Sequence, residues 1–95
     1  MSAYVIVQVD VTDAAKYDVY KPLAATAVEK HGGRYLARGG ETEDLEGVRP
    51  HARLVILEFP TFEQAKAWYH SPEYQAAKAA RESAGRGVFS VVAGV

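Results

Sequence analysis

The order of the strand-like and helix-like segments constrains the fold of this chain more than any other sequence feature. Four strand-like segments and two helical patterns follow one another in the order β-α-β-β-α-β. The helical patterns begin at Thr12-Asp13 and at Thr61, where side-chain oxygens can cap a first turn. The predicted strands are residues 3–10, 34–38, 53–59 and 88–93.

Each predicted helix contains a proline. In the first helix, Pro22 removes one backbone hydrogen bond and crowds the preceding turn, which predicts a kink or break near Tyr20. In the second helix, Ser71 can cap a new segment that has Pro72 at its first position, so we expect the helix to pause there. Gly85 is expected to end this helix before the last strand.

The predicted sheet has one face suited to helices and one bare face. Alternate residues from Ala3 to Val9 are aliphatic, which favours packing against helices. The element order then predicts a ferredoxin-like α+β domain over residues 1–95, with a four-stranded antiparallel sheet and both helices on one face. Ile6, Leu54 and Ile56 fall on the other face, and an apolar face of this size favours stacking with a second copy.

The second strand and the segment after it carry most of the polar pattern. Strand alternation places Tyr35 on one face of the sheet and Arg38 on the other. After Gly39-Gly40, the stretch 41–50 holds Glu41, Glu43, Asp44 and Glu46 without helical or strand periodicity, which predicts an acidic loop.

Composition excludes several classes of function. The 95 residues carry 11 Lys+Arg and 12 Asp+Glu, and this balance argues against a nucleic-acid surface. The absence of cysteine excludes disulfides and thiolate metal sites. No apolar run reaches the roughly 20 residues of a membrane span, and no signal peptide is recognisable, so we expect a cytoplasmic protein. His31, His51 and His70 are about 20 residues apart along the chain and predict no metal site.

Several short motifs along the chain carry a family resemblance: Gly32-Gly33-Arg34-Tyr35, Arg38-Gly39-Gly40, Glu46-Gly47, Arg53, Glu58-Phe59-Pro60 and Trp68-Tyr69-His70-Ser71-Pro72-Glu73-Tyr74. In these motifs the chain resembles the DUF1330 family of the dimeric α/β-barrel superfamily. The resemblance implies a ferredoxin-like protomer whose sheet forms a barrel with a second copy. It implies no reaction, because the family is defined by a domain of unknown function, although the superfamily includes cofactor-independent monooxygenases, haem-degrading enzymes, isomerases and dehalogenases.

Two arginines form the first candidate site. Arg38 and Arg53 lie near the ends of strands that the fold makes neighbours, and Glu46 lies on the loop between them. Two guanidinium groups could fork onto the carboxylate of a ligand. In the alternative, Arg38 or Arg53 pairs with Glu46 and anchors the acidic loop.

Aromatic residues form the second candidate site. Tyr20, Trp68 and Tyr74 lie beside the helix interruptions and face the same side of the sheet, and Tyr74 shares its helical face with Arg81. Phenol and indole rings supply apolar walls with a few directed donors, as in small-molecule pockets. In the alternative, these rings only fill the core of an alanine-rich chain.

One carboxylate, Glu58, falls on the bare face of the predicted sheet. Buried between two copies, it would have a raised pKa and could act as a general base. The alternative is an ion pair across the dimer seam.

Two hypotheses for the function stay open. In the first, a homodimer binds a small acidic or aromatic molecule, with or without cofactor-independent enzymatic activity. The ligand-binding residues are then Tyr20, Arg38, Glu46, Arg53, Trp68 and Tyr74. In the second, the chain is a non-catalytic structural or interaction dimer with no small-molecule site. Neither hypothesis involves a metal, an organic cofactor, nucleic acid or a membrane.

Overall fold

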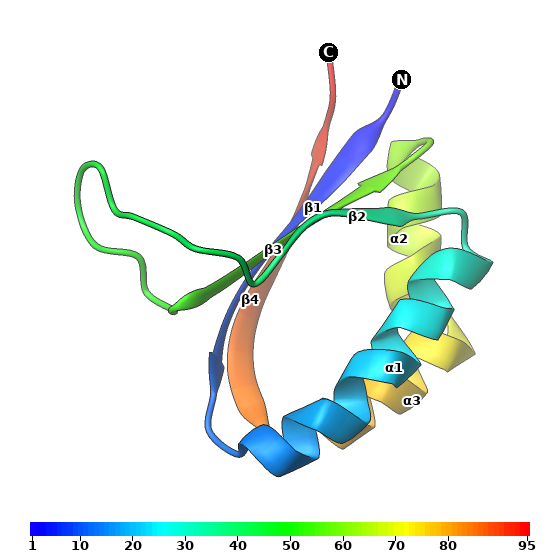
Figure 1. Cartoon of the computed structure of the whole chain (residues 1–95). Coiled ribbons are helices and arrows are strands. Elements are labelled where there is room, and N and C mark those ends of the chain that lie inside the picture. Colours follow the sequence, from blue (N-terminus) through cyan, green and yellow to red (C-terminus); the bar gives the residue numbers. More distant parts are fainter.

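The computed structural model describes all 95 residues, and Figure 1 shows a twisted sheet with its helices packed together against one face. The elements are β1 (Ala3–Val11), α1 (Ala14–Lys30), β2 (Arg34–Arg38), β3 (Arg53–Phe59), α2 (Phe62–His70), α3 (Pro72–Arg81) and β4 (Gly85–Ala93). The strand order across the sheet is β2-β3-β1-β4, and every neighbouring pair is antiparallel. The predicted ferredoxin-like topology is thus confirmed, with the second helical region divided into two helices.

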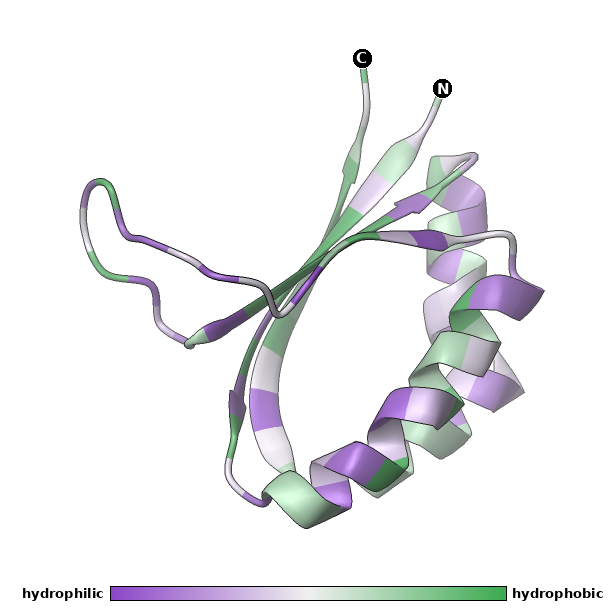
Figure 2. Ribbon diagram, viewed as in Figure 1, coloured by the Kyte–Doolittle hydropathy of each residue, from purple (hydrophilic) through white to green (hydrophobic).

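The core lies between the sheet and the helices. Alternate residues of β1 from Ala3 to Val9 are buried, as their aliphatic pattern predicts, and those of β3 do the same from Val55 to Phe59. Trp68 from α2 and Tyr74 from α3 are among the largest fully buried side chains. Hydrophobic colour runs through the middle of β1 and β3 in Figure 2. One sheet face therefore supplies most of the core.

Of the predicted kink or break near Tyr20, the break does not occur. Helix α1 runs without interruption from Ala14 to Lys30 with Pro22 inside it, and Asp13 caps its first turn by accepting a hydrogen bond from the Lys16 backbone nitrogen. Tyr20 and Ala24, on either side of the proline, are both buried against the rest of the protein. We attribute the continuity of the helix to this packing, which outweighs the loss of one backbone hydrogen bond.

Ser71 divides the second helical region, as predicted. Its hydroxyl donates to the Trp68 carbonyl over 2.7 Å and accepts from the Tyr74 backbone nitrogen over 3.1 Å. One side chain therefore ends α2 and begins α3, and Pro72 occupies the first turn of α3, where it costs no hydrogen bond.

The last strand is longer than predicted. It begins at Gly85, the glycine expected to act only as a helix stop, and pairs with β1 from Val11 onward. A Cβ atom at Gly85 would lie 2.5 Å from the Asp10 carbonyl oxygen, so only glycine allows this approach of the two strands.

A β-bulge corrects the predicted alternation of β2. Tyr35 pairs with Leu57, and the register then shifts so that Arg38 pairs with Val55. Leu57 and Val55 both face the helices, because both are buried in the core. The extra residue thus turns Arg38 to the same face as Tyr35, where simple alternation had placed it on the opposite one.

The acidic loop between β2 and β3 projects away from the rest of the molecule in Figure 1. Residues 41–48 are all exposed, in agreement with the predicted loop. Asp10 ties the end of the loop to β1: its carboxylate accepts a hydrogen bond from the Ala52 backbone nitrogen over 2.9 Å, and it lies 2.7 Å from His51 Nδ1.

The face of the sheet away from the helices is open and partly apolar. Ile6 and Ile56 are paired at its centre, and Val88 and Val92 of β4 are about half exposed. No helix is long and apolar enough to cross a membrane.

The double capping role of Ser71 generates a stability prediction. Ser71→Ala removes an acceptor and a donor that are both buried, so we expect the free energy of unfolding to fall by about 1–2 kcal/mol. Urea unfolding followed by circular dichroism measures the loss, with Ser83→Ala, an exposed serine, as the control. Equal midpoints for the two variants would show that the helix junction does not depend on this hydroxyl.

Candidate functional site

A small cavity of about 30 Å³ lies between the helix-facing side of the sheet and helix α1. Aromatic side chains form most of its walls, and Lys and Arg side chains lie at its mouth. The rings include Tyr17, Tyr20, Tyr35 and Trp68, and the cations include Arg38 and Arg53. Four of the six sequence-predicted site residues, Tyr20, Arg38, Arg53 and Trp68, therefore lie around one cavity.

The bulge in β2 brings Arg38 to this cavity. Because Arg38 and Tyr35 share a face, the guanidinium carbon of Arg38 lies 4.4 Å from the centre of the Tyr35 ring. The guanidinium also donates a long hydrogen bond, 3.4 Å, to the Lys21 carbonyl of α1. Arg38 thus spans from the sheet edge to the helix across the mouth of the cavity.

Arg53 reaches the same cavity from the first position of β3. Its guanidinium lies 5.5 Å from the centre of the Tyr17 ring and directly against Gly39, where a Cβ atom would collide with Arg53 Nη1. Gly39 also has a φ of 69°, in the region that favours glycine. The Nε of Arg53 is buried and has no hydrogen-bond acceptor.

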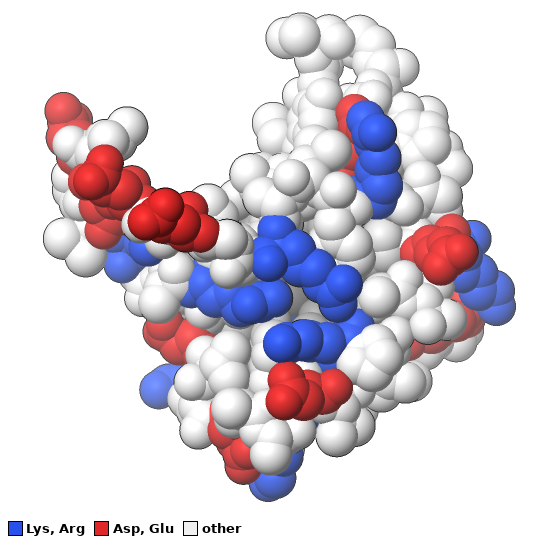
Figure 3. All heavy atoms as spheres, viewed as in Figure 1, with Lys and Arg blue, Asp and Glu red and all other residues white.

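Positive charge gathers at the cavity mouth without a matching carboxylate. Figure 3 shows Lys and Arg side chains clustered on the face where the sheet meets α1. Lys21 has a partner, with its Nζ 3.3 Å from Asp18 Oδ1, whereas Arg38 and Arg53 form no ion pair. The two arginines therefore present unpaired guanidinium groups at one opening.

Glu46 does not join this cluster. It lies exposed on the projecting loop and forms no ion pair with Arg38 or Arg53. The loop has an ion pair of its own, in which Arg49 Nη1 lies 2.7 Å from Asp44 Oδ1. The alternative in which Glu46 neutralises an arginine of the site is absent from this structure.

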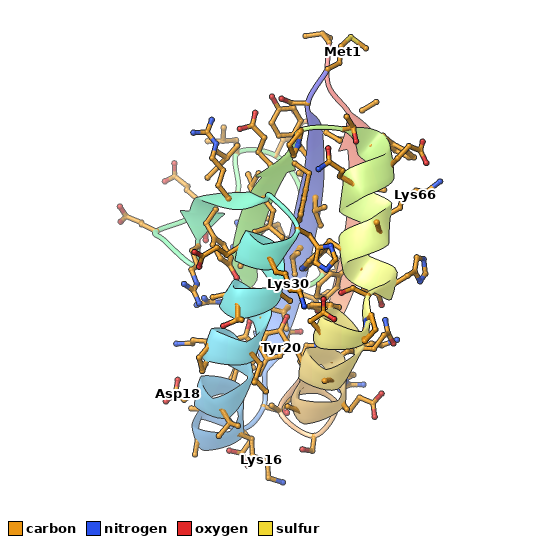
Figure 4. The ribbon with its side chains drawn as sticks, turned by 90° about the vertical axis from the view of Figure 1, so that its right-hand side faces the viewer. Met1, Lys16, Asp18, Tyr20, Lys30 and Lys66 are labelled. Atoms are coloured by element: carbon orange, nitrogen blue, oxygen red, sulfur yellow. The ribbon has the colours of Figure 1, made fainter.

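Tyr74 stands behind the cavity wall and is linked to it by hydrogen bonds. The hydroxyls of Tyr20 and Tyr74 are 2.9 Å apart, and Arg81 Nη1 donates to the Tyr74 hydroxyl over 3.3 Å. Figure 4 shows Tyr20 between α1 and α3. Burial raises the pKa of Tyr20 to about 12 and also raises that of Tyr74. Both phenols are therefore protonated at neutral pH and can act as donors.

Trp68 forms the floor of the cavity and is 2% exposed. Its ring packs on Tyr74 and Phe59, with centroid distances of 4.5 and 5.3 Å. Its indole N–H is buried without an acceptor, although buried polar groups are nearly always paired. Together with Arg53 Nε, it is a donor that a bound molecule could satisfy.

Glu58 is not placed to act as the general base considered above. Arg34, directly opposite on β2, donates from Nε to Glu58 Oε1 over 2.6 Å. This hydrogen bond holds the pKa of Glu58 below its usual value, the reverse of the shift that a base working near neutral pH requires. The pair forms within one chain and needs no dimer seam.

The three histidines are far from one another. His31 Nε2 lies 3.0 Å from Glu73 Oε1, His51 is bound to Asp10, and His70 is exposed on α2. No three His, Asp or Glu side chains come together as ligands for one ion.

Two residues of the cavity mouth, Lys21 and Tyr35, were not predicted from the sequence as part of the site. Lys21 follows Tyr17 by one helical turn, so the i, i+4 spacing could have placed both at the same opening. No sequence spacing places Tyr35 at this opening, because its closeness to Arg38 depends on the bulge in β2.

The buried tyrosine pair generates a prediction about alkaline pH. Tyrosine in the unfolded chain ionises near pH 10, whereas Tyr20 in the folded protein ionises near 12. The stability gained from keeping this phenol protonated is complete below pH 10 and is lost as the pH rises towards 12. We expect urea midpoints to fall less steeply over this range in Tyr20→Phe than in the parent protein. Tyr4→Phe, on the opposite sheet face, is the control, and identical slopes for all three proteins would contradict the prediction.

Comparison with solved structures supports the fold. A protein of unknown function from Rhodopseudomonas palustris has a TM-score of 0.78 at 17% identity, covering 99% of this chain and 82% of the other. A dimeric ferredoxin-like protein of unknown function from Jannaschia sp. CCS1 has a TM-score of 0.69 at 12% identity, with coverage of 97% and 98%. SnoaB, a cofactor-independent oxygenase from Streptomyces nogalater, has a TM-score of 0.67 at 8% identity, with coverage of 99% and 93%.

Sequence comparison identifies a family. Among curated proteins, none matches the chain. A family described as "Domain of unknown function (DUF1330)" matches residues 2–95, which confirms the resemblance noted in the sequence. The chain therefore belongs to the DUF1330 family.

Proposed function

We propose that this protein is a homodimer that binds a small acidic molecule, with an aromatic or otherwise flat body, in the cavity between the sheet and α1. The observation that carries the proposal is the pair of guanidinium groups, Arg38 and Arg53, at one opening without a carboxylate partner. A guanidinium group matches the geometry of a carboxylate, and two positive charges at one opening favour an anionic ligand.

The remaining groups suit such a ligand. Tyr20 and Trp68 would flank its body, and the buried donors Arg53 Nε and Trp68 Nε1 would find acceptors on it. Tyr74 would hold the Tyr20 hydroxyl in place through their 2.9 Å contact.

Binding requires the mouth of the cavity to open. A volume of about 30 Å³ has room for about two water molecules. The side chains that close the mouth, Arg38 and Lys21, are long and partly or fully exposed, so they can move without disturbing the core. The small volume also favours the alternative, a dimer in which the same residues only pack and no ligand binds.

Ligand binding is the proposed activity, and a cofactor-independent reaction on the bound molecule would be a further step. SnoaB is a cofactor-independent oxygenase, but at 8% identity its similarity to this chain supports a shared fold alone. The cavity lining contains no carboxylate and no imidazole, and burial raises the pKa of both Tyr20 and Tyr35. Any cofactor-independent reaction here would therefore depend on a base carried by the ligand.

The bare sheet face supports the dimer. Ile6, Leu54 and Ile56 lie at its centre with the half-exposed Val88 and Val92 beside them. The solved neighbour from Jannaschia is described as dimeric. Stacking of two such faces would bury apolar surface that one chain leaves open. A cytoplasmic location remains part of the proposal, on the ground of the cysteine-free sequence.

The test of the site is native mass spectrometry of freshly purified protein, followed by denaturation of the same sample. We expect a dimer with additional mass that denaturation releases for identification. We further expect Arg38→Ala to reduce binding of the released molecule by roughly ten- to hundredfold, since a hydrogen bond to a charged group contributes ~1.5–3 kcal/mol. The melting temperature should stay unchanged, because Arg38 is exposed. Lys16→Ala, which changes an exposed lysine in the first turn of α1 outside the cavity lining, is the matched control.

Two outcomes would count against the proposed site. A bare dimer from every preparation would favour the packing alternative. Unfolding or dissociation of Arg38→Ala would show that this arginine is structural.

The dimer generates a separate prediction. Ile56→Lys puts an ammonium group at the centre of the bare face, where burial against a second copy would cost several kcal/mol. We expect a folded monomer by light scattering and circular dichroism, while Val19→Lys, on the exposed side of α1, stays dimeric. A dimeric Ile56→Lys protein would place the interface elsewhere.

A further inference from the structure

A second and larger cavity, of about 320 Å³, lies at the opposite edge of the sheet. The first cavity is beside β2 and β3, whereas the second is half open and is lined mainly by α2, the edge strand β4 and Arg81 of α3. Trp68 and Phe89 line both cavities and form the wall between them. The second volume is within the range of pockets that hold small organic molecules.

Arg81 is the unusual residue of this second cavity. It is 8% exposed and belongs to no ion pair, although buried charges in proteins are nearly always paired. Its Nη1 donates a 3.3 Å hydrogen bond to the Tyr74 hydroxyl, and its guanidinium carbon lies 4.4 Å from the centre of the Phe89 ring and 6.0 Å from that of Tyr20. One neutral acceptor and two rings leave most of the guanidinium's five N–H donors without an acceptor from the protein.

The charge around this cavity has one sign. The charged or titratable lining groups, apart from a tyrosine, are Lys66, His70 and Arg81, and no carboxylate lies among them. Lys66 contributes less than Arg81, because its Nζ is 3.5 Å from Glu63 Oε2 and it projects outward from α2 in Figure 4. The buried charge that lacks a counter-ion is therefore that of Arg81.

The walls of the cavity are aromatic. Trp68, Tyr69 and Phe89 surround it, with Tyr69 and Phe89 centroids 5.8 Å apart. Flat rings beside a guanidinium favour a ligand that combines an aromatic ring with an anionic group.

We propose that this second cavity is a separate binding site for small aromatic carboxylates, in which Arg81 holds the carboxylate and the rings of Trp68, Tyr69 and Phe89 contact the ligand's ring. The proposal does not depend on a ligand in the first cavity. It rests on the unpaired guanidinium of Arg81 in an open volume lined by rings.

The experiment uses benzoate as the probe and benzyl alcohol as its neutral match. Trp68 is the single tryptophan of the chain, so its indole N–H gives one nuclear magnetic resonance signal that reports binding on either side of the wall. We expect this signal to shift in a saturable way with benzoate and to stay unmoved with benzyl alcohol. In Arg81→Met the benzoate affinity should fall roughly ten- to hundredfold. In Arg86→Met, which changes an exposed arginine of β4 outside the cavity lining, it should stay unchanged.

Two further variants keep the test valid if Arg81→Met fails to fold. Arg81→Lys retains the charge but loses the fork, so it should bind benzoate more weakly while staying folded. Val91→Phe narrows the second cavity from β4 without changing any charge, and it should also weaken binding. Normal benzoate affinity in both variants would overturn the proposal.

Arg53→Met changes the first cavity only, so comparing it with Arg81→Met separates this proposal from that for the first cavity. Loss of affinity in Arg53→Met alone would place benzoate in the first cavity, which overturns the second site and leaves the proposed function intact. A single benzoate site per chain that both Arg81→Met and Arg53→Met weaken would indicate one continuous site, and no saturable shift in the parent protein would show that no such site exists; either result overturns the proposal.

Discussion

Burial of a single face of the sheet under the helices is the constraint on which the other features of this protein depend. Alternate residues of β1 and β3 supply that face, and Phe59, Trp68 and Tyr74 fill the space beneath the helices. The intervening residues of the same strands must then form the open face. One side-chain pattern therefore defines both the core and the surface available to a second copy.

A departure from that pattern builds the candidate site. Leu36 is the extra residue of the β2 bulge, and its insertion moves Arg38 from the open face to the face that carries Arg53. Without it, the two guanidinium groups would lie on opposite sides of the sheet. The local irregularity thus concentrates charge at one opening, at the cost of regular pairing at the sheet edge.

The features predicted correctly from the sequence are those encoded over a few neighbouring residues. The aliphatic alternation of β1, the caps at Asp13 and Ser71 and the acidic loop all have this local character. The errors concern contacts between distant segments. The bulge depends on pairing with β3, and the role of Gly85 depends on its approach to Asp10. Helical spacing placed Arg81 beside Tyr74, but only the tertiary structure shows that no carboxylate meets it.

The exposed loop between β2 and β3 divides the chain into two pieces whose strands are interleaved. The first piece carries β1 and β2, the second carries β3 and β4, and the sheet order is β2-β3-β1-β4. Neither piece contains two neighbouring strands, so neither can form any part of this sheet alone. A chain cut at the loop would be a pair of fragments that acquire structure only by assembling with each other, with every ladder of backbone hydrogen bonds crossing between them.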